Sequence, residues 1–145
     1  MMELCFTTAA EDDIQPIICL SKALIEEYED LSVIDYPKVL QWVETKIRNN
    51  IGKYTAIAFN EEKVGYFRLD RKDNKWELDD FYILPQFRNK GIGSAVISHI
   101  CQSTTGCIYL YVFTNNKGAI SLYERFGFKR VQTVSNTRQI MERPG

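Results

Sequence analysis

The stretch Arg88-Asn89-Lys90-Gly91-Ile92-Gly93-Ser94 decides the fold of this 145-residue chain. Two glycines one residue apart let backbone N–H groups turn toward an anion, and a helix that begins there points the positive end of its dipole at the same place. Arg88 and Lys90 add charged hydrogen-bond donors beside those amides. The stretch therefore predicts a pyrophosphate site. The alternative is an ordinary strand-to-helix turn in which glycine is needed only for a positive φ.

Segments with different periods flank this stretch. Residues 92–100 repeat apolar side chains at helical spacing, and the unbroken apolar run at 107–113 predicts a strand that is covered on both faces. Upstream, strand patterns at 54–59, 64–69 and 76–84 are joined by polar turns, which predicts an antiparallel meander. Because a helix separates the strand at 76–84 from the strand at 107–113, these two strands are predicted to form a parallel crossover.

The N-terminal part is predicted to contain one strand and two helices. The strand covers residues 4–7 and the first helix about 10–29, with capping-box spacing between Thr8 and Glu11. A second helix begins after Asp35, whose side chain can cap it.

The C-terminal part begins with a short helix after Asn116, which Gly127 ends. Two further strands near 128–133 and 137–142 follow. No repeat, low-complexity tract or linker interrupts the sequence, so residues 1–145 are predicted to form a single α/β (α+β) domain. Its sheet is mixed and mostly antiparallel, has six or seven strands, and carries helices on both faces.

Composition excludes several classes of protein. Eighteen basic and nineteen acidic residues leave a net charge of −1, which argues against a nucleic-acid binder with a broad basic surface. No stretch approaches the ~20 apolar residues that span a bilayer, and the N-terminus lacks a basic region followed by an apolar run. The four cysteines form no Cys-x-x-Cys pair or His cluster, so no metal site is expected. The chain is expected to be cytoplasmic, with reduced cysteines and no membrane contact.

Two other glycine-rich loops fit the sequence poorly. A Rossmann loop needs a third glycine three residues after Gly93, where the chain has Val96, and it needs an opening βαβ unit. A Walker-type loop needs Gly-Lys-Ser/Thr after four variable residues, and that tripeptide is absent.

The arrangement resembles the GCN5-related N-acetyltransferase (GNAT) family. The family signature, Arg/Gln-x-x-Gly-x-Gly/Ala, corresponds to residues 88–93, and residues 81–85 match the strand end that precedes it. A second family segment, Asn-x-x-Ala followed by Leu-Tyr-Glu-x-x-Gly-Phe, corresponds to residues 116–128. The resemblance covers about residues 76–130, whereas the first 75 residues match by pattern only.

The resemblance implies that acetyl-CoA binds, without a metal, where the strands ending at Leu84 and Phe113 splay apart. Backbone groups of Phe81, Ile83 and Leu84 would then pair with the pantetheine arm. Asn116 would lie near the pantetheine or the leaving sulfur, although it can also cap its own helix. The pyrophosphate would be held by amides of Arg88, Asn89, Lys90, Gly91, Ile92, Gly93 and Ser94.

The same resemblance nominates the catalytic side chains. Tyr123 would protonate the departing CoA thiolate, although its place in an apolar helical stripe also fits a core residue. Asp79 is the first choice for the base that deprotonates the amine, and Glu77 is the second; the alternative is a surface pair of carboxylates. Strand alternation predicts that both share a face, with Asp80 on the other. His99 is expected at the edge of the core rather than as a base.

The predicted function is transfer of an acetyl group to a primary amine of a small, cationic acceptor by direct attack. The positive charge of the acceptor is inferred from Asp79, Asp80 and an acidic segment that comprises Glu26, Glu27, Glu29, Asp30 and Asp35. Two alternatives remain open: acetylation of a protein or peptide, and a non-catalytic module that binds acyl-CoA. No nucleic-acid or membrane partner is expected, and a homodimer is the default assembly.

Overall fold

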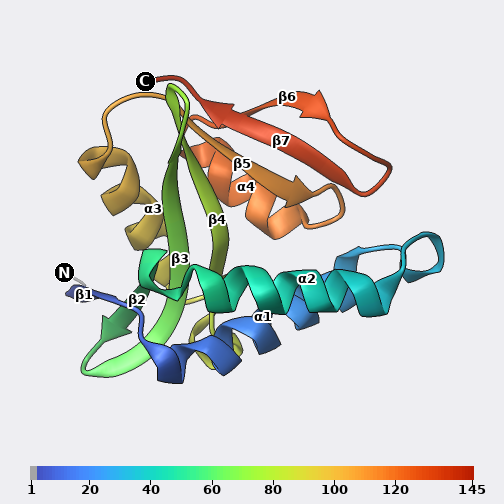
Figure 1. The fold of residues 1–145 in the computed structure, drawn as a ribbon. Coiled ribbons are helices and arrows are strands. Elements are labelled where there is room, and N and C mark those ends of the chain that lie inside the picture. Colours follow the sequence, from blue (N-terminus) through green and yellow to red (C-terminus); the bar gives the residue numbers. More distant parts are fainter. Residues whose placement is uncertain (1–2) are drawn as a thin grey trace.

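The structure is a computed structural model that describes residues 3–145; Met1 and Met2, the start of the N-terminal stretch considered above, lie outside it. Every predicted helix and strand is present (Figure 1). In chain order they are β1 (Leu4–Thr8), α1 (Ile14–Tyr28), α2 (Tyr36–Asn49), β2 (Tyr54–Phe59), β3 (Glu62–Lys72), β4 (Lys75–Ile83), α3 (Ile92–Ser103), β5 (Ile108–Phe113), α4 (Lys117–Arg125), β6 (Lys129–Thr133) and β7 (Arg138–Arg143).

The strands form one seven-stranded sheet in the order β1-β2-β3-β4-β5-β7-β6. Neighbouring strands are antiparallel except β4 and β5, which are parallel and are joined through α3. The predicted fold class, the meander and the crossover are therefore confirmed.

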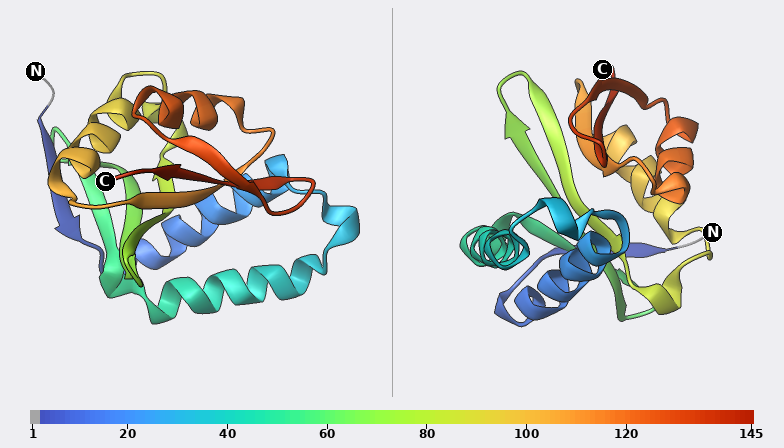
Figure 2. Two further views of the ribbon diagram at one scale, coloured as in Figure 1. Left: turned by 90° about the horizontal axis from the view of Figure 1, so that it is seen from above. Right: turned by 90° about the vertical axis from the view of Figure 1, so that its right-hand side faces the viewer.

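Helices cover both faces of the sheet and create two apolar cores. The right-hand view of Figure 2 shows α1 and α2 on one side of the strands and α3 and α4 on the other. Val96, Leu110 and Tyr123 belong to the core under α3 and α4, whereas Ile17, Ile47 and Tyr82 belong to the core under α1 and α2. The sheet therefore separates the two helix pairs, and a site that uses both pairs must lie where the sheet opens.

A β-bulge in β4 breaks the predicted alternation of its side chains. Asp79 pairs with Arg68 and Tyr82 pairs with Tyr66, so two residues of β4 oppose one residue of β3. Asp80, in the bulge, has a φ of 48°. As a result Asp80 shares the α2-facing side with Asp79. The prediction that these two carboxylates lie on opposite faces is wrong.

The strand β5 is fully covered on one face only, contrary to the prediction; on the other face Phe113 packs against the core under α1 and α2, but Tyr111 does not. Ile108, Leu110 and Val112 are buried under α3 and α4. Tyr111 is 43% exposed because α1 and α2 do not extend over the opposite face at this point. In this apolar run, aliphatic and aromatic residues alternate between more buried and more exposed positions, so the run did not indicate a strand that is buried on both faces.

Two local predictions also need correction. The N-cap position of the first helix is Asp13, whose carboxylate accepts the N–H of Ala10 at 2.9 Å and so closes the short 3-10 turn that precedes the helix, while Thr8 belongs to β1. His99 is exposed, and its ring stacks on Phe6 at 4.2 Å between centroids. By contrast the predicted Asp35 cap is confirmed, since its side chain accepts the N–H of Lys38. Within residues 3–145, none of the helices is both long and apolar enough to cross a membrane.

Candidate active site

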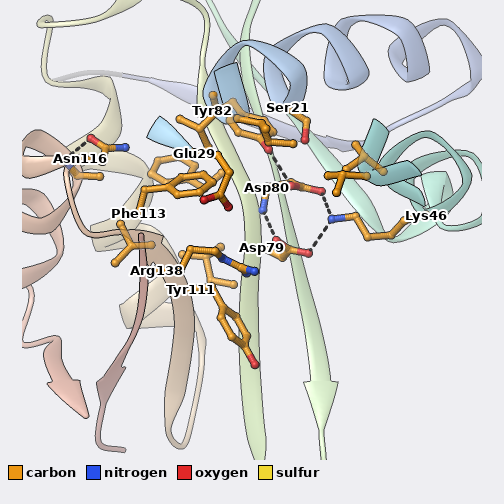
Figure 3. A pocket seen from close by; sticks show the side chains of 18 of the residues that line it. Ser21, Glu29, Lys46, Asp79, Asp80, Tyr82, Tyr111, Phe113, Asn116 and Arg138 are labelled. Carbon is orange, nitrogen blue, oxygen red and sulfur yellow. Dashed lines mark hydrogen bonds and ion pairs between the residues drawn. The ribbon is translucent and has the colours of Figure 1, made fainter. Parts of the chain in front are cut away.

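The strands β4 and β5 separate soon after they meet. They pair only at Trp76 with Ile108 and at Glu77 with Tyr109, and Figure 1 shows them diverging beyond that point. A pocket of about 630 Å³ opens in the gap. Its walls come from α1, α2, β4, β5, α4 and β7 (Figure 3). The pocket is thus the place where the two helix pairs and the open sheet edge meet.

Backbone groups of β4 line this open edge in a way that the sequence anticipated only in part. The N–H of Leu84 donates to the carbonyl of Val64 at 2.8 Å, and the carbonyl of Leu84 accepts the N–H of Phe87 at 2.9 Å. Leu84 is therefore already paired. Since backbone groups of successive strand residues point to opposite edges, those of Phe81 and Ile83 face β5.

The glycine turn has the predicted geometry of a helix N-terminus. Gly91 adopts a φ of 82° and forms the N-cap of α3, and its carbonyl accepts the N–H of Ala95 at 3.1 Å. Asn89 is also left-handed, with a φ of 61°. The first amides of α3 have no acceptor within the helix, so they are available to an anion. Ile92 is buried, which fixes the turn against the core.

Basic side chains surround the turn, but they do not all serve as free donors. The N–H of Arg88 donates to Pro85, and its Nε donates to the carbonyl of Ile83 at 2.9 Å, so Arg88 mainly ties the turn to β4. Lys90 is exposed. Arg125 donates to the hydroxyl of Ser94 at 3.3 Å, which brings a further positive charge from α4. Sequence reasoning missed Arg125 because only the fold places α4 beside α3.

Asn116 and Tyr123 reach the same pocket from the other side. The Oδ1 of Asn116 accepts the N–H of Ala119 at 3.2 Å, which confirms the N-cap role and leaves the Nδ2 donors available. Tyr123 is 8% exposed and packs against Phe128. Burial, together with the charge of Asp79, raises the pKa of the Tyr123 phenol well above its ordinary value, so the phenol stays protonated.

Asp79 and Asp80 are held in a network of buried charges (Figure 3). Asp79 accepts from Arg68 at 2.7 Å and from Lys46 at 3.2 Å, and Lys46 also lies 2.9 Å from Asp80. Asp80 accepts further bonds from the hydroxyls of Tyr54 and Tyr82. Burial alone would raise the pKa of Asp79, but the two cations more than offset this and hold it below its ordinary value.

Arg68 and Lys46 were not predicted from the sequence. Arg68 is a buried cation in the middle of the apolar strand β3, and that position was a usable signal because an unpaired charge is not stable there. Lys46 gave no such signal, since lysine is ordinary on an amphipathic helix.

Glu77 differs from both aspartates. Among residues 3–145 no cation lies within ion-pair distance of its carboxylate. It is half-buried on the pocket wall. Burial, and then the negative charge of Asp79, raise the pKa of Glu77 above its ordinary value. A carboxylate with a raised pKa and no partner is better suited to accept a proton than one held by two cations.

The acidic segment contributes less to the pocket than predicted. Only Glu29 lines it, and Glu29 accepts a hydrogen bond from the hydroxyl of Thr137. Asp30 and Asp35 accept backbone N–H groups at helix starts, and Glu26 accepts from the hydroxyl of Tyr36. These local bonds explain why the acidic residues cluster in sequence without gathering in the pocket.

The splayed sheet and the glycine turn define this molecule as an α/β protein of the N-acetyltransferase fold. Residues 20–128 match the acetyltransferase (GNAT) family, and the chain belongs to that family. The resemblance inferred from the two sequence motifs is thereby confirmed.

The individual relatives share only part of their sequence with this chain. The chain is 33% identical over 96 residues to N-alpha-acetyltransferase 50 of Danio rerio, which covers 59% of this chain and 57% of that protein. It is 41% identical over 66 residues to the spermine/spermidine N(1)-acetyltransferase of Bacillus subtilis, covering 41% and 43%. The chain thus spans about half the length of these curated relatives.

A solved structure supports the fold over the whole chain. The PaiA N-acetyltransferase of Thermoplasma acidophilum in complex with coenzyme A superposes with a TM-score of 0.72 and 19% sequence identity. The comparison covers 99% of this chain and 100% of that one.

Proposed function

We propose that this chain transfers the acetyl group of acetyl-CoA to a primary amine of a small acceptor by direct attack. The observation that carries the proposal is the opening between β4 and β5, whose wall holds the unpaired carboxylate of Glu77, together with the helix N-terminus at residues 91–92, which packs beside α4 of the pocket wall. Membership of the acetyltransferase family supports the same reaction.

The coenzyme half of the site uses mainly backbone groups. The amides of residues 89–94 would hold the pyrophosphate, as expected for an anion at a helix N-terminus. The backbone groups of Phe81 and the N–H of Ile83 would pair with the pantetheine arm, as an edge strand pairs with a peptide, while the carbonyl of Ile83 already accepts from Arg88. These donors would stabilise the anion by hydrogen bonds and by the helix dipole.

The chemical step needs one base and one acid. Glu77, directly or through a water, takes a proton from the acceptor ammonium, and the free amine then attacks the thioester carbon. When the tetrahedral intermediate collapses, the carbon–sulfur bond breaks and Tyr123 gives its proton to the leaving sulfur. The nitrogen loses its remaining extra proton as the neutral amide forms, and this proton returns, through water, to the Tyr123 phenolate. Asp79 was the first choice for this base in the sequence analysis. The ion pairs of Asp79 with Lys46 and Arg68 make Glu77 the preferred base here.

We still propose a cationic acceptor, but the carboxylates that support this class differ from those inferred from the sequence. Asp79 and Asp80 are neutralised by Lys46 and Arg68, so Glu29 and Glu77 are the carboxylates left to attract a cation. Similarity to a spermine/spermidine acetyltransferase supports this class, whereas similarity to N-alpha-acetyltransferase 50 supports a peptide acceptor. CoA release measured across polyamines, aminoglycosides and peptides separates the two, and coenzyme binding without turnover of any amine would indicate a binding module.

The glycine turn can be tested by Gly91→Asp. We expect CoA to bind at least about tenfold more weakly, because a negative charge would face the pyrophosphate and a side chain at a φ of 82° costs on the order of 1–3 kcal/mol. Isothermal titration calorimetry measures the affinity. Gly52→Asp is the control, since an added Cβ at Gly52 meets nothing within 4 Å. Lys90→Glu tests the charge alone, and unchanged binding in both turn variants would contradict the proposed site.

The acid can be tested by Tyr123→Phe. We expect turnover to fall at least about tenfold while acetyl-CoA affinity stays unchanged, because only proton donation in the transition state is lost. The phenyl ring still packs on Phe128, so the thermal midpoint should change little. Tyr36→Phe is the matched control, because Tyr36 neither lines the pocket nor contacts Glu77. Equal losses of turnover and coenzyme affinity would argue for a packing role.

A further inference from the structure

One cationic side chain in the pocket has no ionic partner. Lys46 and Arg138 are the two cations that line the pocket. Lys46 is paired with Asp79 and Asp80, whereas no carboxylate oxygen in residues 3–145 lies within 4.0 Å of the Arg138 guanidinium. A partly buried guanidinium without a counter-charge is available to an anionic ligand group.

The position of Arg138 is fixed by the fold. Its backbone pairs with Phe113 of β5, and its carbonyl accepts the N–H groups of Val134 and Ser135 in the β6–β7 turn. The guanidinium lies over the ring of Tyr111, 4.9 Å from the ring centroid. Figure 3 shows the side chain reaching toward β4 between Glu29 and Tyr111. Stacking on an aromatic ring holds the planar donor fork in place before a ligand arrives.

This position lies on the acceptor side of the pocket. Tyr111 is two residues beyond Tyr109, which pairs with Glu77, so the backbone of the residue on which Arg138 stacks is about 7 Å further along the strand direction than that of the proposed base. The proposed pyrophosphate site is at residues 89–94, on a different element. An anion held by Arg138 would therefore belong to the molecule that carries the amine.

We propose that Arg138 binds a carboxylate of the acceptor, so that the preferred substrate is an amino acid with a primary amine rather than a simple polyamine. This inference rests on the proposed acetyl transfer and specifies its substrate class. Arg138 would donate two N–H groups to the carboxylate in a bidentate pair, while Glu77 faces the amine. The carboxylate group would also balance the net charge of the pocket, where Glu29 and Glu77 attract the ammonium group.

A matched pair of acceptors tests this inference. Lysine and 1,5-diaminopentane share the same amine and chain, and they differ only in the carboxylate. We expect wild type to prefer lysine, and Arg138→Gln to lower the kcat/KM ratio of lysine to diaminopentane at least about tenfold, as expected for loss of a charged hydrogen-bonded pair. Arg138→Lys, which keeps the charge but loses the fork, should give an intermediate ratio. Arg130→Gln, at an exposed position on β6, is the control and should leave the ratio unchanged.

Each other outcome has a definite reading. A wild-type enzyme that shows no preference for lysine, or an Arg138→Gln ratio equal to that of wild type, overturns the inference but leaves the acetyl transfer intact. If Arg138→Gln weakens CoA binding in calorimetry, the anion belongs to the cosubstrate and the inference is wrong. If wild type acetylates neither of these two amines but acetylates another amine of the wider panel, the inference is wrong and the acetyl transfer stands. If it acetylates no amine at all, the proposed function fails, and binding of lysine compared with diaminopentane to the CoA-loaded protein then decides the role of Arg138 alone.

Discussion

Glu77→Gln is expected to lower kcat/KM for acetyl transfer by about 100-fold to 10,000-fold, the range usually found for loss of a general base. The amide is nearly isosteric with the carboxylate but cannot accept a proton at neutral pH. Glu77 has no ion pair in the structure, so the change should leave the thermal midpoint near that of wild type. Steady-state kinetics with saturating acetyl-CoA measures the effect, and Glu124→Gln, on the exposed surface of α4, is the matched control.

The pH profile distinguishes Glu77 from Asp79 as the base. Burial and the charge of Asp79 raise the pKa of Glu77. If the Glu77 carboxylate is the base, activity should therefore decrease as the pH is lowered, with a midpoint above pH ~4.3, the ordinary glutamate pKa. Asp79, whose pKa is held low, would give no acid limb above pH ~4. A profile that stays flat down to pH ~4, combined with full activity of Glu77→Gln, would refute the role of Glu77.

Arg68→Met is expected to destabilise the fold by about 3 kcal/mol, the low end of the cost of removing one partner from a buried ion pair. Arg68 donates to Asp79 at 2.7 Å and to Asp70 at 3.2 Å, and its side chain is only 8% exposed. The low end applies because Lys46 still accompanies Asp79, and because methionine removes the Nε of Arg68, which lacks a partner. Urea denaturation measures the free energy of unfolding.

A second variant separates lost charge pairing from lost packing. Adding Asp79→Asn to Arg68→Met removes the uncompensated carboxylate, so the double variant should be more stable than Arg68→Met alone. Lys53→Met removes an exposed cation 3.7 Å from Asp70 and should cost no more than about 1 kcal/mol. If the double variant is less stable than Arg68→Met, ion pairing is not what Arg68 contributes.

The same network sets the acid stability of the protein. Because the pKa of folded Asp79 is below its unfolded value, its contribution to stability is complete above the unfolded pKa and is lost as the pH falls through the folded pKa. In Arg68→Met this pKa should rise toward the ordinary value, so the variant should lose its difference from wild type progressively in acid.

Several parts of the site could be predicted because short-range geometry determines them. The turn at Gly91 needs a residue that tolerates a positive φ, and the helix after it needs apolar side chains at helical spacing; both requirements are visible in a few consecutive residues. The caps at Asp35 and Asn116 are equally local. The direction of β5 relative to β4 followed from the intervening helix.

The errors have a different origin. The prediction that side chains alternate between the two faces along β4 was wrong, because the bulge at Asp80 depends on pairing with β3. The residues around Asp80 contain no sequence signal for a bulge. The role of Asp79 as the base stays a prediction, but it was made without Lys46 and Arg68, which pair with Asp79 from 33 and 11 residues away in sequence. Tyr111 looked like a covered residue because its exposure depends on where α1 and α2 end.

By itself the amino-acid sequence determined the order of helices and strands, the glycine turn and the family, because these depend on periodicity and on the backbone preferences of neighbouring residues. Only the tertiary structure decided which carboxylates are neutralised and which cation is left for a ligand. The physical reason is that the Coulomb energy of a charged side chain depends on its burial and on its distance from other charges. These two quantities are set only when α2, β3, β4 and β7 come together around one pocket and place their charged side chains there: Lys46, Arg68, Asp79 and Arg138.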